Sequence, residues 1–298
     1  MTTDPQRPHR GTIHASDAEV LAHASWPDDQ YVLRLAAPAC AAAARPGQFV
    51  HVQCAAHIPM RRPLSLLRAD AGAGWIEVLY KTHGVGLAAL AAARPGDRVS
   101  VLGPIGRGFE PVAARPQAVL IGGGVGIPPL VFLAERLRAD GAVPLPVGFF
   151  GSELPFPFAL RTATVPLPGT PPAASASLAA LDALGIAVRL ASRAGHPGCH
   201  PGFVTDLARA WLATRPPADL DRMVVYACGP GPMLQATQRL AREFALPTQL
   251  CLEEFMACAV GGCAGCAVMV HGPDGPAMKR VCVDGPVFDA ERVFPAAA

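Results

Sequence analysis

The chain has 298 residues, of which 51% are hydrophobic and only 16% are charged. At about 150 residues per domain, this length predicts two domains rather than one and is ample for a buried core. The 25 basic and 23 acidic residues are mixed along the sequence and leave a formal net charge of +2. This balance argues against a nucleic acid or an anionic membrane surface as a partner.

No part of the sequence reaches the ~20 uninterrupted apolar residues that a membrane-spanning helix needs. The best candidate, residues 118–134, is interrupted by glycines and prolines. The first eleven residues lack the apolar core of a secretory signal. We therefore expect a cytoplasmic protein that does not enter a membrane.

Short apolar segments separated by turn signals run from residue 11 to about residue 114. Residues 31–35, 48–52, 75–80 and 98–102 each alternate or run apolar, and Pro-Gly pairs precede two of these segments. Residues 86–94 have a helical composition and end at a Pro-Gly stop. Several brief strands at such spacing predict a small antiparallel β-barrel over residues 11–114.

The pattern changes to alternating strands and helices after residue 115. An apolar strand at 118–121, a glycine-rich turn, a helix at 130–137 and a strand near 147–150 form a βαβ unit. Further apolar segments lie at 186–190 and 223–228, and a helix is predicted at 233–244. We expect a doubly wound parallel sheet over residues 115–247, with an irregular excursion of unassigned role at residues 154–177.

Residues 248–298 form a third predicted unit that is too small to bury a core alone, so a staple such as a metal centre is expected. Of the nine cysteines, Cys258, Cys263, Cys266 and Cys282 fall close together near the C-terminus. Such clustering in a cytosolic chain favours metal ligation over disulfides. The other five cysteines are predicted to be core residues.

The cysteine spacing indicates which metal centre this is. Cys258-x4-Cys263-x2-Cys266 with a distant Cys282 is the spacing of plant-type [2Fe–2S] ligation. Three glycines between the first three cysteines allow the loop to double back. A structural zinc site is the alternative, but it typically uses paired Cys-x2-Cys units. The sequence therefore predicts that these four cysteines hold a [2Fe–2S] cluster.

Two strand-to-helix junctions in residues 115–247 are rich in glycine or proline. Backbone N–H groups at such a junction, together with the positive end of the helix dipole, suit a pyrophosphate. An ordinary tight turn is the alternative, since the first junction departs from the GxGxxG pattern. Two junctions on neighbouring strand ends would form one crevice, which favours a nucleotide. The predicted nucleotide-binding residues are Gly122, Gly123, Gly124, Gly126, Cys228, Gly229 and Pro230.

The first domain carries weaker signals of the same kind. The segment Arg62-Pro63-Leu64-Ser65 is expected just past a strand, and a helix is expected to start near Gly86. Arginine offers a forked donor suited to a diphosphate, and a serine hydroxyl can reach a flavin ring. A surface arginine and an ordinary turn explain these residues nearly as well.

Taken together, these segments resemble a known family. The resemblance rests on the segments 61–65, 101–109, 121–130, 202–206, 226–230, 254–258 and 282–288. They are similar to the ferredoxin-reductase superfamily and, more narrowly, to the electron-transfer subunits of the heteromeric, NAD-linked dihydroorotate dehydrogenases. The resemblance runs from about residue 11 to residue 288. It implies FAD on the barrel, in contact with Arg62, Pro63, Leu64, Ser65, Leu79, Tyr80, Lys81, Gly86 and Leu87.

The resemblance also implies a function. It implies an oxidoreductase subunit that passes electrons from an FMN-containing catalytic subunit through the [2Fe–2S] cluster and FAD to NAD⁺, in pyrimidine biosynthesis. A heterotetramer with two copies of each subunit is expected, and no residue is predicted to act as a catalytic acid or base. The alternatives are a NAD(P)H-dependent reductase component for another oxidoreductase and a zinc-stapled, nucleotide-binding regulatory protein.

Some residues depart from the family pattern. Leu87 stands where the family usually has a hydroxyl side chain, and residues 154–177 form a longer segment than expected. Ser192 and Arg193 replace an acidic stretch that would lie near the nucleotide ribose. Because a guanidinium suits phosphate, NADP remains open beside the expected NAD.

Overall fold

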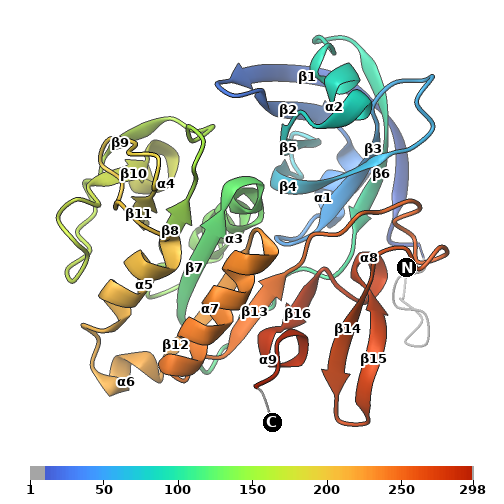
Figure 1. The fold of residues 1–298 in the computed structure, drawn as a ribbon. Helices are drawn as coiled ribbons and strands as arrows, with labels where there is room; N and C mark the ends of the chain where they lie inside the picture. The colour runs from blue at the N-terminus through green and yellow to red at the C-terminus, as the bar shows by residue number, and fades with distance from the viewer. Residues whose placement is uncertain (1–10, 297–298) are drawn as a thin grey trace. The chain divides into compact units, whose positions relative to one another are not determined.

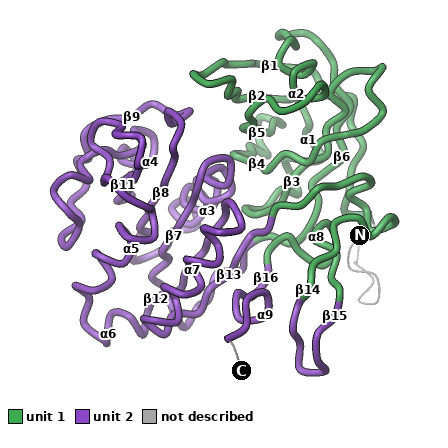
Figure 2. The backbone as a smooth tube through the Cα atoms, viewed as in Figure 1, with its two compact units in different colours: residues 1–108, 253–269, 278–287 green, residues 109–252, 270–277, 288–298 purple. Residues whose placement is uncertain are grey.

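The computed structural model describes residues 11–296, so most of the N-terminal segment considered above lies outside the described residues. The chain divides into two compact units (Figure 2). Unit 1 comprises residues up to 108 with 253–269 and 278–287, and unit 2 comprises 109–252, 270–277 and the residues from 288 onward. Among residues 11–296, no helix has the length and apolar character needed to cross a bilayer.

Unit 1 contains a closed barrel of six antiparallel strands in the order β1-β2-β5-β4-β3-β6 (Figure 1). The strands are β1 (His14–Trp26), β2 (Gln30–Ala36), β3 (Phe49–Gln53), β4 (Arg62–Asp70), β5 (Trp75–Lys81) and β6 (Arg98–Ile105). Two helices accompany them, α1 (Pro38–Ala43) and α2 (Gly84–Ala91). The predicted barrel is confirmed, and the four predicted strands overlap β2, β3, β5 and β6.

The position expected for residues 62–65 is wrong. These residues do not follow a strand but begin β4, where Pro63 lies opposite His51 of β3. Proline lacks the N–H that a ladder needs, and this loss is tolerated near the start of a strand. Because β4 starts with Arg62-Pro63, its first residues do not show the apolar pattern of a strand.

Unit 2 contains the predicted parallel sheet, whose strand order is β11-β8-β7-β12-β13-β16. Neighbouring strands from β11 to β13 are parallel. The strands are β7 (Gln117–Gly123), β8 (Val147–Gly151), β11 (Ala187–Ala191), β12 (Met223–Cys228), β13 (Thr248–Cys251) and β16 (Val287–Asp289). Their near-continuous burial, with Val119, Leu120 and Ile121 fully inaccessible, explains the unbroken apolar runs in the sequence.

The helices of unit 2 are arranged as the strand order requires. They are η1 (Gly124–Gly126), α3 (Ile127–Ala139), α4 (Ala179–Ala183), α5 (Val204–Leu212), α6 (Pro217–Leu220) and α7 (Gly231–Glu243). The chain winds outward through β7, β8 and β11 and then returns to β12 and β13. Because such crossovers are right-handed, α3 and α4 lie on one face of the sheet and α5 and α7 on the other. The contacts α3–α4 and α5–α7 agree with this arrangement.

The sequence predicted an irregular segment at residues 154–177. The structure instead contains short secondary-structure elements there. β9 (Leu160–Thr162) pairs with β10 (Ala176–Leu178), and strands of three residues are too short to show a period. A buried carboxylate anchors the segment. Asp182 accepts hydrogen bonds from the N–H groups of Thr164 and Val165 at 2.9 and 3.2 Å and from the Thr164 hydroxyl at 2.6 Å.

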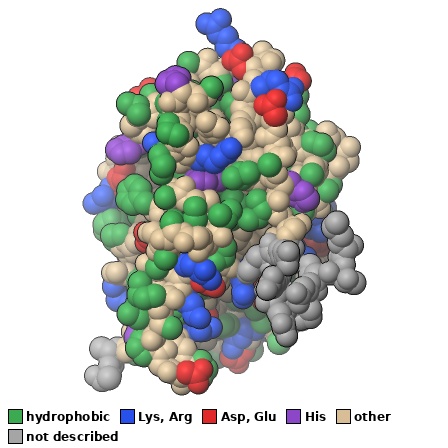
Figure 3. All heavy atoms as spheres, turned by 90° about the vertical axis from the view of Figure 1, so that its right-hand side faces the viewer, with side chains coloured by type: hydrophobic (Ala, Val, Ile, Leu, Met, Phe, Trp, Pro, Cys, Tyr) green, Lys and Arg blue, Asp and Glu red, His purple; other side chains and the backbone are tan. Residues whose placement is uncertain are grey.

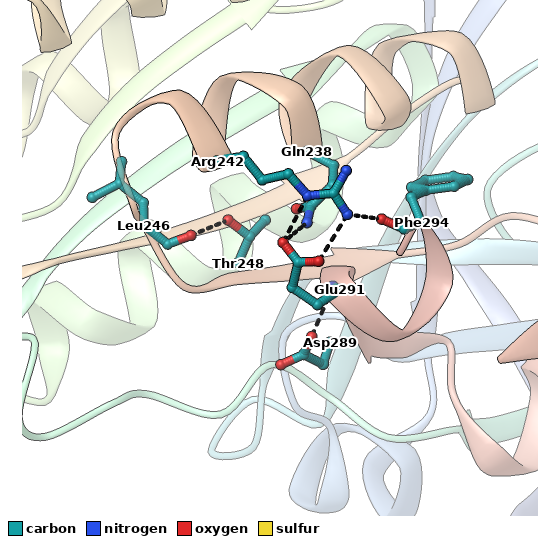
Figure 4. A network of polar contacts seen from close by, with 7 residues as sticks. All are labelled: Gln238, Arg242, Leu246, Thr248, Asp289, Glu291 and Phe294. Atoms are coloured by element: carbon teal, nitrogen blue, oxygen red, sulfur yellow. Dashed lines mark hydrogen bonds and ion pairs between the residues drawn. The ribbon is translucent and has the colours of Figure 1, made fainter. Parts of the chain in front are cut away.

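Residues 289–294 fold back onto helix α7 through a polar network (Figure 4). Glu291, in α9 (Ala290–Val293), accepts from Gln238 at 2.6 Å and from two nitrogens of Arg242 at 2.9 and 2.7 Å. Arg242 also donates to the carbonyl oxygen of Phe294. The Asp289 side chain caps α9 by accepting from the N–H of Glu291 at 2.8 Å.

The remaining elements belong to the cysteine-rich part of the chain. They are the hairpin of β14 (Ala267–Gly272) and β15 (Gly275–Arg280) and the short helix α8 (Val281–Asp284).

On the face drawn in Figure 3, basic and acidic side chains lie interspersed, with hydrophobic side chains spread among them. This distribution matches the small formal net charge of the sequence.

We expect Asp182→Ala to lower the free energy of unfolding by about 1–3 kcal/mol, because it removes a buried carboxylate that accepts three hydrogen bonds from Thr164 and Val165. Burial alone would raise the pKa of Asp182, but the hydrogen bonds from Thr164 and Val165 lower it. The contribution of Asp182 to the free energy of unfolding is therefore complete above the pKa of an unfolded aspartate. It is lost as the pH falls through the lowered pKa of Asp182 in the folded protein. Denaturant unfolding at several pH values measures this loss.

Asp182→Asn is the matched control, since its amide oxygen still accepts from the backbone, and it should cost less. An Asp182→Ala variant as stable as the parent at neutral pH would contradict the anchoring role. So would a difference in stability that stays constant into strong acid.

Candidate functional site

The four predicted cluster ligands all lie in unit 1. Three are in the loop of residues 258–266, and Cys282 is in α8. Cys263 is exposed, Cys258 is half-buried, and Cys266 and Cys282 are buried. The N–H of Val281 donates to the carbonyl oxygen of Cys266 at 3.0 Å, which joins the loop to the helix that carries the fourth thiol.

The loop curls because three of its residues adopt the left-handed conformation. Ala259, Gly261 and Ala264 have φ values of 56°, 82° and 53°. Glycine takes this conformation freely, whereas alanine does so at a cost, and such strain is typical of functional loops. The sequence therefore predicted the curl correctly but not that two alanines would contribute to it.

The curl turns backbone donors toward sulfur. The N–H of Cys263 donates to Sγ of Cys258 and the N–H of Gly265 to Sγ of Cys263, both at 3.4 Å. Burial raises the pKa of Cys258, but the backbone donors at Val260, Gly262 and Cys263 outweigh it and lower the pKa to about 7. Because the thiolate is the metal-binding form, this loop is arranged for ligation.

The four thiols form two contacting pairs. The N–H of Cys263 donates to Sγ of Cys258, and the Cys266 side chain lies close enough to Cys282 to raise its pKa. Burial and the contact with Cys266 raise the pKa of Cys282 to about 12. Among residues 11–296, no three His, Cys, Asp or Glu side chains gather closely enough for a single ion. Two pairs of thiols are what two bridged irons require, so these residues fit a [2Fe–2S] cluster.

The cysteine segment is attached to the barrel by its backbone. The N–H of Arg107 donates to the carbonyl oxygen of Gly285 at 2.6 Å, and Arg107 forms a parallel β-bridge with Pro286. A Cβ atom at Gly106 would come within 2.4 Å of Pro286, so only glycine permits this approach. Cys282, three residues before Gly285, is thus fixed relative to the end of β6.

A histidine that no sequence pattern indicated also lies where the cysteine segment meets the barrel. His51 of β3 is 1% exposed and lies against the backbone of Met256, two residues before Cys258. Burial and the positive charge of Arg61 lower the pKa of His51 to about 4, so the ring is neutral at physiological pH. No local signal could have identified it, because its neighbour lies some two hundred residues away in the sequence.

Two of the residues predicted to contact FAD meet at the start of α2. The Arg62 guanidinium lies within 3.1 Å of the position that a Cβ of Gly86 would take. Helix α2 has neither a side-chain N-cap nor an acidic residue in its first turn. A guanidinium beside an uncapped helix N-terminus is a strongly positive environment that an anion stabilises. These residues therefore fit the diphosphate of a dinucleotide such as FAD.

The other residues predicted on the flavin side line the barrel wall. Ser65 is half-buried on β4, Leu64 and Leu79 are buried, and Lys81 is exposed. Tyr80 is 2% exposed, and its hydroxyl lies 2.9 Å from Nε2 of His23. Because the Tyr80 hydroxyl already has this partner, its backbone and ring rather than its hydroxyl shape the wall. Leu87 is half-buried in the first turn of α2.

In unit 2, the two predicted nucleotide junctions touch each other. A Cβ at Gly126 would come within 2.5 Å of the backbone of Cys228 and Gly229. A Cβ at Gly123 would come within 2.5 Å of Sδ of Met233, in the first turn of α7. The glycines are thus required for the two junctions to pack together.

One part of the first junction remains open. Gly124 has a φ of 54°, is exposed, and would have no neighbour within 4 Å of a Cβ. It precedes α3, which begins with Ile127-Pro128-Pro129 and has no acidic residue in its first turn. Pro230 is exposed at the start of α7, whereas Cys228 and Gly229 are buried. An exposed glycine turn at an uncapped helix start fits a pyrophosphate.

Comparisons with known proteins agree with this arrangement. Residues 253–294 match the model of the iron–sulfur cluster binding domain of dihydroorotate dehydrogenase B. The chain is 39% identical over 254 residues to the dihydroorotate dehydrogenase B (NAD(+)) electron transfer subunit of Bacillus caldolyticus, covering 84% of this chain and 86% of that protein. It is 38% identical over 268 residues to the same subunit of Geobacillus thermodenitrificans, covering 88% and 92%.

A solved structure shows the same fold over nearly the whole chain. An NADH-dependent reduced ferredoxin-NADP oxidoreductase superposes with a TM-score of 0.73 at 26% identity, covering 93% of this chain and 90% of that chain. The barrel, the doubly wound sheet and the cysteine segment together define an electron-transfer oxidoreductase of the ferredoxin-reductase type.

The particular family follows from the similarity of the sequence. The chain belongs to the dihydroorotate dehydrogenase B (NAD(+)) electron transfer subunits. The resemblance noted from the sequence motifs is thereby confirmed, as is the prediction of an NAD-linked oxidoreductase subunit.

Replacing Cys263 with Ser should remove iron while leaving flavin bound. The substitution takes one thiolate from the Cys258–Cys263 pair and leaves the contact between Arg62 and Gly86 unchanged in sequence. Elemental analysis for iron and zinc, beside the flavin-to-protein ratio, measures both effects. Cys199→Ser is the matched control, because Cys199 is a buried thiol in unit 2 and should leave the iron content unchanged. Full iron occupancy in Cys263→Ser would show that the ligand set is wrong.

Proposed function

We propose that the chain performs its electron-transfer role with three bound groups, each held by the residues described above. A [2Fe–2S] cluster is held by Cys258, Cys263, Cys266 and Cys282. FAD is held on the barrel by Arg62, Pro63, Leu64, Ser65, Leu79, Tyr80, Lys81, Gly86 and Leu87, and NAD by Gly122, Gly123, Gly124, Gly126, Cys228, Gly229 and Pro230. When bound, the cluster handles single electrons, whereas the flavin stores two and exchanges hydride with a nicotinamide.

The observation that carries this proposal is the pairing of four thiols in a segment attached to the barrel. Cys258 and Cys263 form one pair, and Cys266 and Cys282 form the other. The segment and the barrel belong to the same compact unit. The chain's own contribution is therefore to bind the carriers, orient them and supply N–H donors to sulfur, with no side chain acting as a catalytic acid or base.

We divide the chain into three functional parts. Residues 11–114 bind FAD, residues 115–247 bind the nicotinamide nucleotide, and residues 248–298 bind the cluster. The closed barrel and the parallel sheet support the first two parts. The third is a functional part rather than a separate body, because its residues are shared between the two compact units.

The partner in this proposal is an FMN-containing catalytic subunit that oxidises dihydroorotate, in a complex with two copies of each chain. The related subunits are named as electron transfer subunits of dihydroorotate dehydrogenase B. The cysteine loop carries features suited to a partner: Cys263 is exposed, and Phe255 is 90% exposed three residues before Cys258. Large apolar side chains exposed in this way are typical of interaction surfaces.

Spectroscopy of the purified chain tests the proposed function. We expect flavin absorption with broader iron–sulfur absorption, and a paramagnetic signal after anaerobic reduction. Addition of dihydroorotate together with the catalytic partner, purified from the native host, should reduce NAD⁺. A colourless chain with stoichiometric zinc would contradict the proposal, and reduction of NAD⁺ by dihydroorotate without a partner would contradict the assigned division of labour.

Arg62→Ala should lower the amount of FAD retained through purification, because it removes the forked cation beside the open N-terminus of α2. The loss of charge-assisted hydrogen bonds to phosphate corresponds to roughly a tenfold or greater weakening of binding. The ratio of flavin to protein and a titration of the apoprotein with FAD measure it. Arg68→Ala is the matched control: Arg68 lies on the same strand but pairs with Glu77 at 3.4 Å. Equal FAD affinity in both variants would rule out the assigned role of Arg62.

A further inference from the structure

The carboxyl edge of the parallel sheet carries charged residues that the proposed nucleotide site does not use. In the strand register, Gly123 of β7 lies beside Gly151 of β8, and Gly151 lies beside Ala191 of β11. Glu153 follows two residues after Gly151, and Arg193 follows two residues after Ala191. A glutamate and an arginine are thus placed in a row with the glycine turn, on the two neighbouring strands.

In a doubly wound sheet, residues at these strand ends contact a bound dinucleotide. The pyrophosphate lies at the first strand's glycine turn, and an acidic residue further along binds the ribose hydroxyls of NAD. An arginine nearby instead accommodates the 2′-phosphate of NADP. Glu153 stands at the acidic position, but its carboxylate is already engaged, since Oε1 lies 3.0 Å from Nε of Arg193.

The arginine is held in place while much of its donor capacity is unused. Its guanidinium lies over the ring of Phe203, 4.5 Å from the centroid, and the side chain is 55% exposed. Within residues 11–296, Nε makes the one hydrogen bond found for this guanidinium. The two terminal nitrogens therefore offer a planar fork toward solvent, which is the geometry that binds a phosphate through two parallel hydrogen bonds.

The surrounding loop suits an anion as well. Ser192 is 1% exposed, and its hydroxyl oxygen accepts from the N–H of Ala194 at 3.1 Å, which fixes the turn that carries Arg193. Residues 192–203 contain two histidines and no acidic residue. Two carboxylates lie nearby: that of Asp206 accepts from the N–H of Phe203 at 3.4 Å, and that of Glu153 is half exposed and paired with Arg193. An exposed ion pair contributes little, so a doubly charged phosphate can replace Glu153 as the partner of Arg193.

From this arrangement we infer that Arg193, on the turn held by Ser192, forms a subsite for the 2′-phosphate of a pyridine dinucleotide. The chain then binds adenosine carrying a 2′-phosphate more tightly than adenosine without it, and accepts NADP(H) beside the NAD of its family. The inference rests on the proposed nucleotide site and adds the feature that discriminates between the two nucleotides. Arg193 acts here as a specificity-determining residue that contacts the ligand.

Calorimetric titration of the full-length holoprotein with 2′,5′-ADP and with 5′-AMP tests the inference without any redox reaction. The two probes differ only in the 2′-phosphate. We expect 2′,5′-ADP to bind about tenfold or more tightly than 5′-AMP, as charge-assisted hydrogen bonds to phosphate imply. Arg193→Ala should reduce this ratio to near one. In ferricyanide reduction, the same variant should lower kcat/KM for NADPH relative to that for NADH by a similar factor.

Two further variants sharpen the result. Arg209→Ala is the matched control, because Arg209 is also an exposed arginine whose Nε donates to a glutamate, Glu243, at 2.9 Å. It should leave the ratio of the two affinities unchanged. Glu153→Gln removes the competing carboxylate and should raise the affinity for 2′,5′-ADP, whereas a purely structural ion pair would give no such gain.

The outcomes separate this inference from the proposed function. Equal binding of the two probes by the parent chain would overturn the inference while leaving the nucleotide site intact. A ratio that survives Arg193→Ala would also overturn it. Binding of neither probe would overturn the nucleotide site itself, and the 2′-phosphate subsite with it.

Discussion

The attachment of the cysteine segment to the barrel is the interaction on which the candidate electron-transfer site depends. A segment of this size cannot bury a core of its own, so its position must come from a neighbour. The barrel supplies that position through backbone contacts from Arg107 to Gly285 and Pro286, and the buried His51 ring lies against the chain at Met256. The contact is made by backbone atoms and by Gly106 against Pro286, with no side chain between them. The segment therefore lies closer to the barrel than it would if side chains packed between the two. Electron carriers gain from such closeness, which no flexible linker would provide.

A second constraint is electrostatic and appears at the starts of the helices. The helices α2, α3 and α7, which begin at the proposed phosphate sites, have no side-chain N-cap and no acidic residue in the first turn. By contrast, α5 carries Asp206 in its first turn, and α9 is capped by Asp289. An acidic cap would satisfy the free N–H groups and repel phosphate at the same time. Helix α1 also lacks both features, so an open start does not by itself mark a site, but it leaves the N–H groups of α2, α3 and α7 available to the proposed phosphates.

Features could be predicted from the sequence where the residues that form them are close together along the chain. The cluster ligands and the glycine turns are local patterns, and the four buried strands β7, β8, β11 and β12 show themselves as apolar runs. The strands β1 and β4 were not predicted, because β1 is largely exposed on one side and β4 begins with Arg-Pro.

Long-range partners were beyond prediction. Residues 192–193 were singled out because arginine suits phosphate, yet nothing local indicated that Glu153 pairs with Arg193. The same holds for His51 and Met256. Such pairs depend on how strands 40 or more residues apart are brought together, which is a property of the folded sheet and barrel.

The topology also explains how so short a cysteine segment can be ordered. The chain leaves the sheet at the end of β13 and rejoins it at β16, and these two strands are neighbours in the strand order. The intervening residues therefore form a closed loop whose ends the sheet already holds, which limits the entropy still to be lost when the segment docks. The contacts of Glu291 with Gln238 and Arg242 hold the far end of that loop on α7 (Figure 4). Since α7 begins at the Cys228–Pro230 junction, one helix carries the nucleotide site at its start and the return of the cysteine segment at its end.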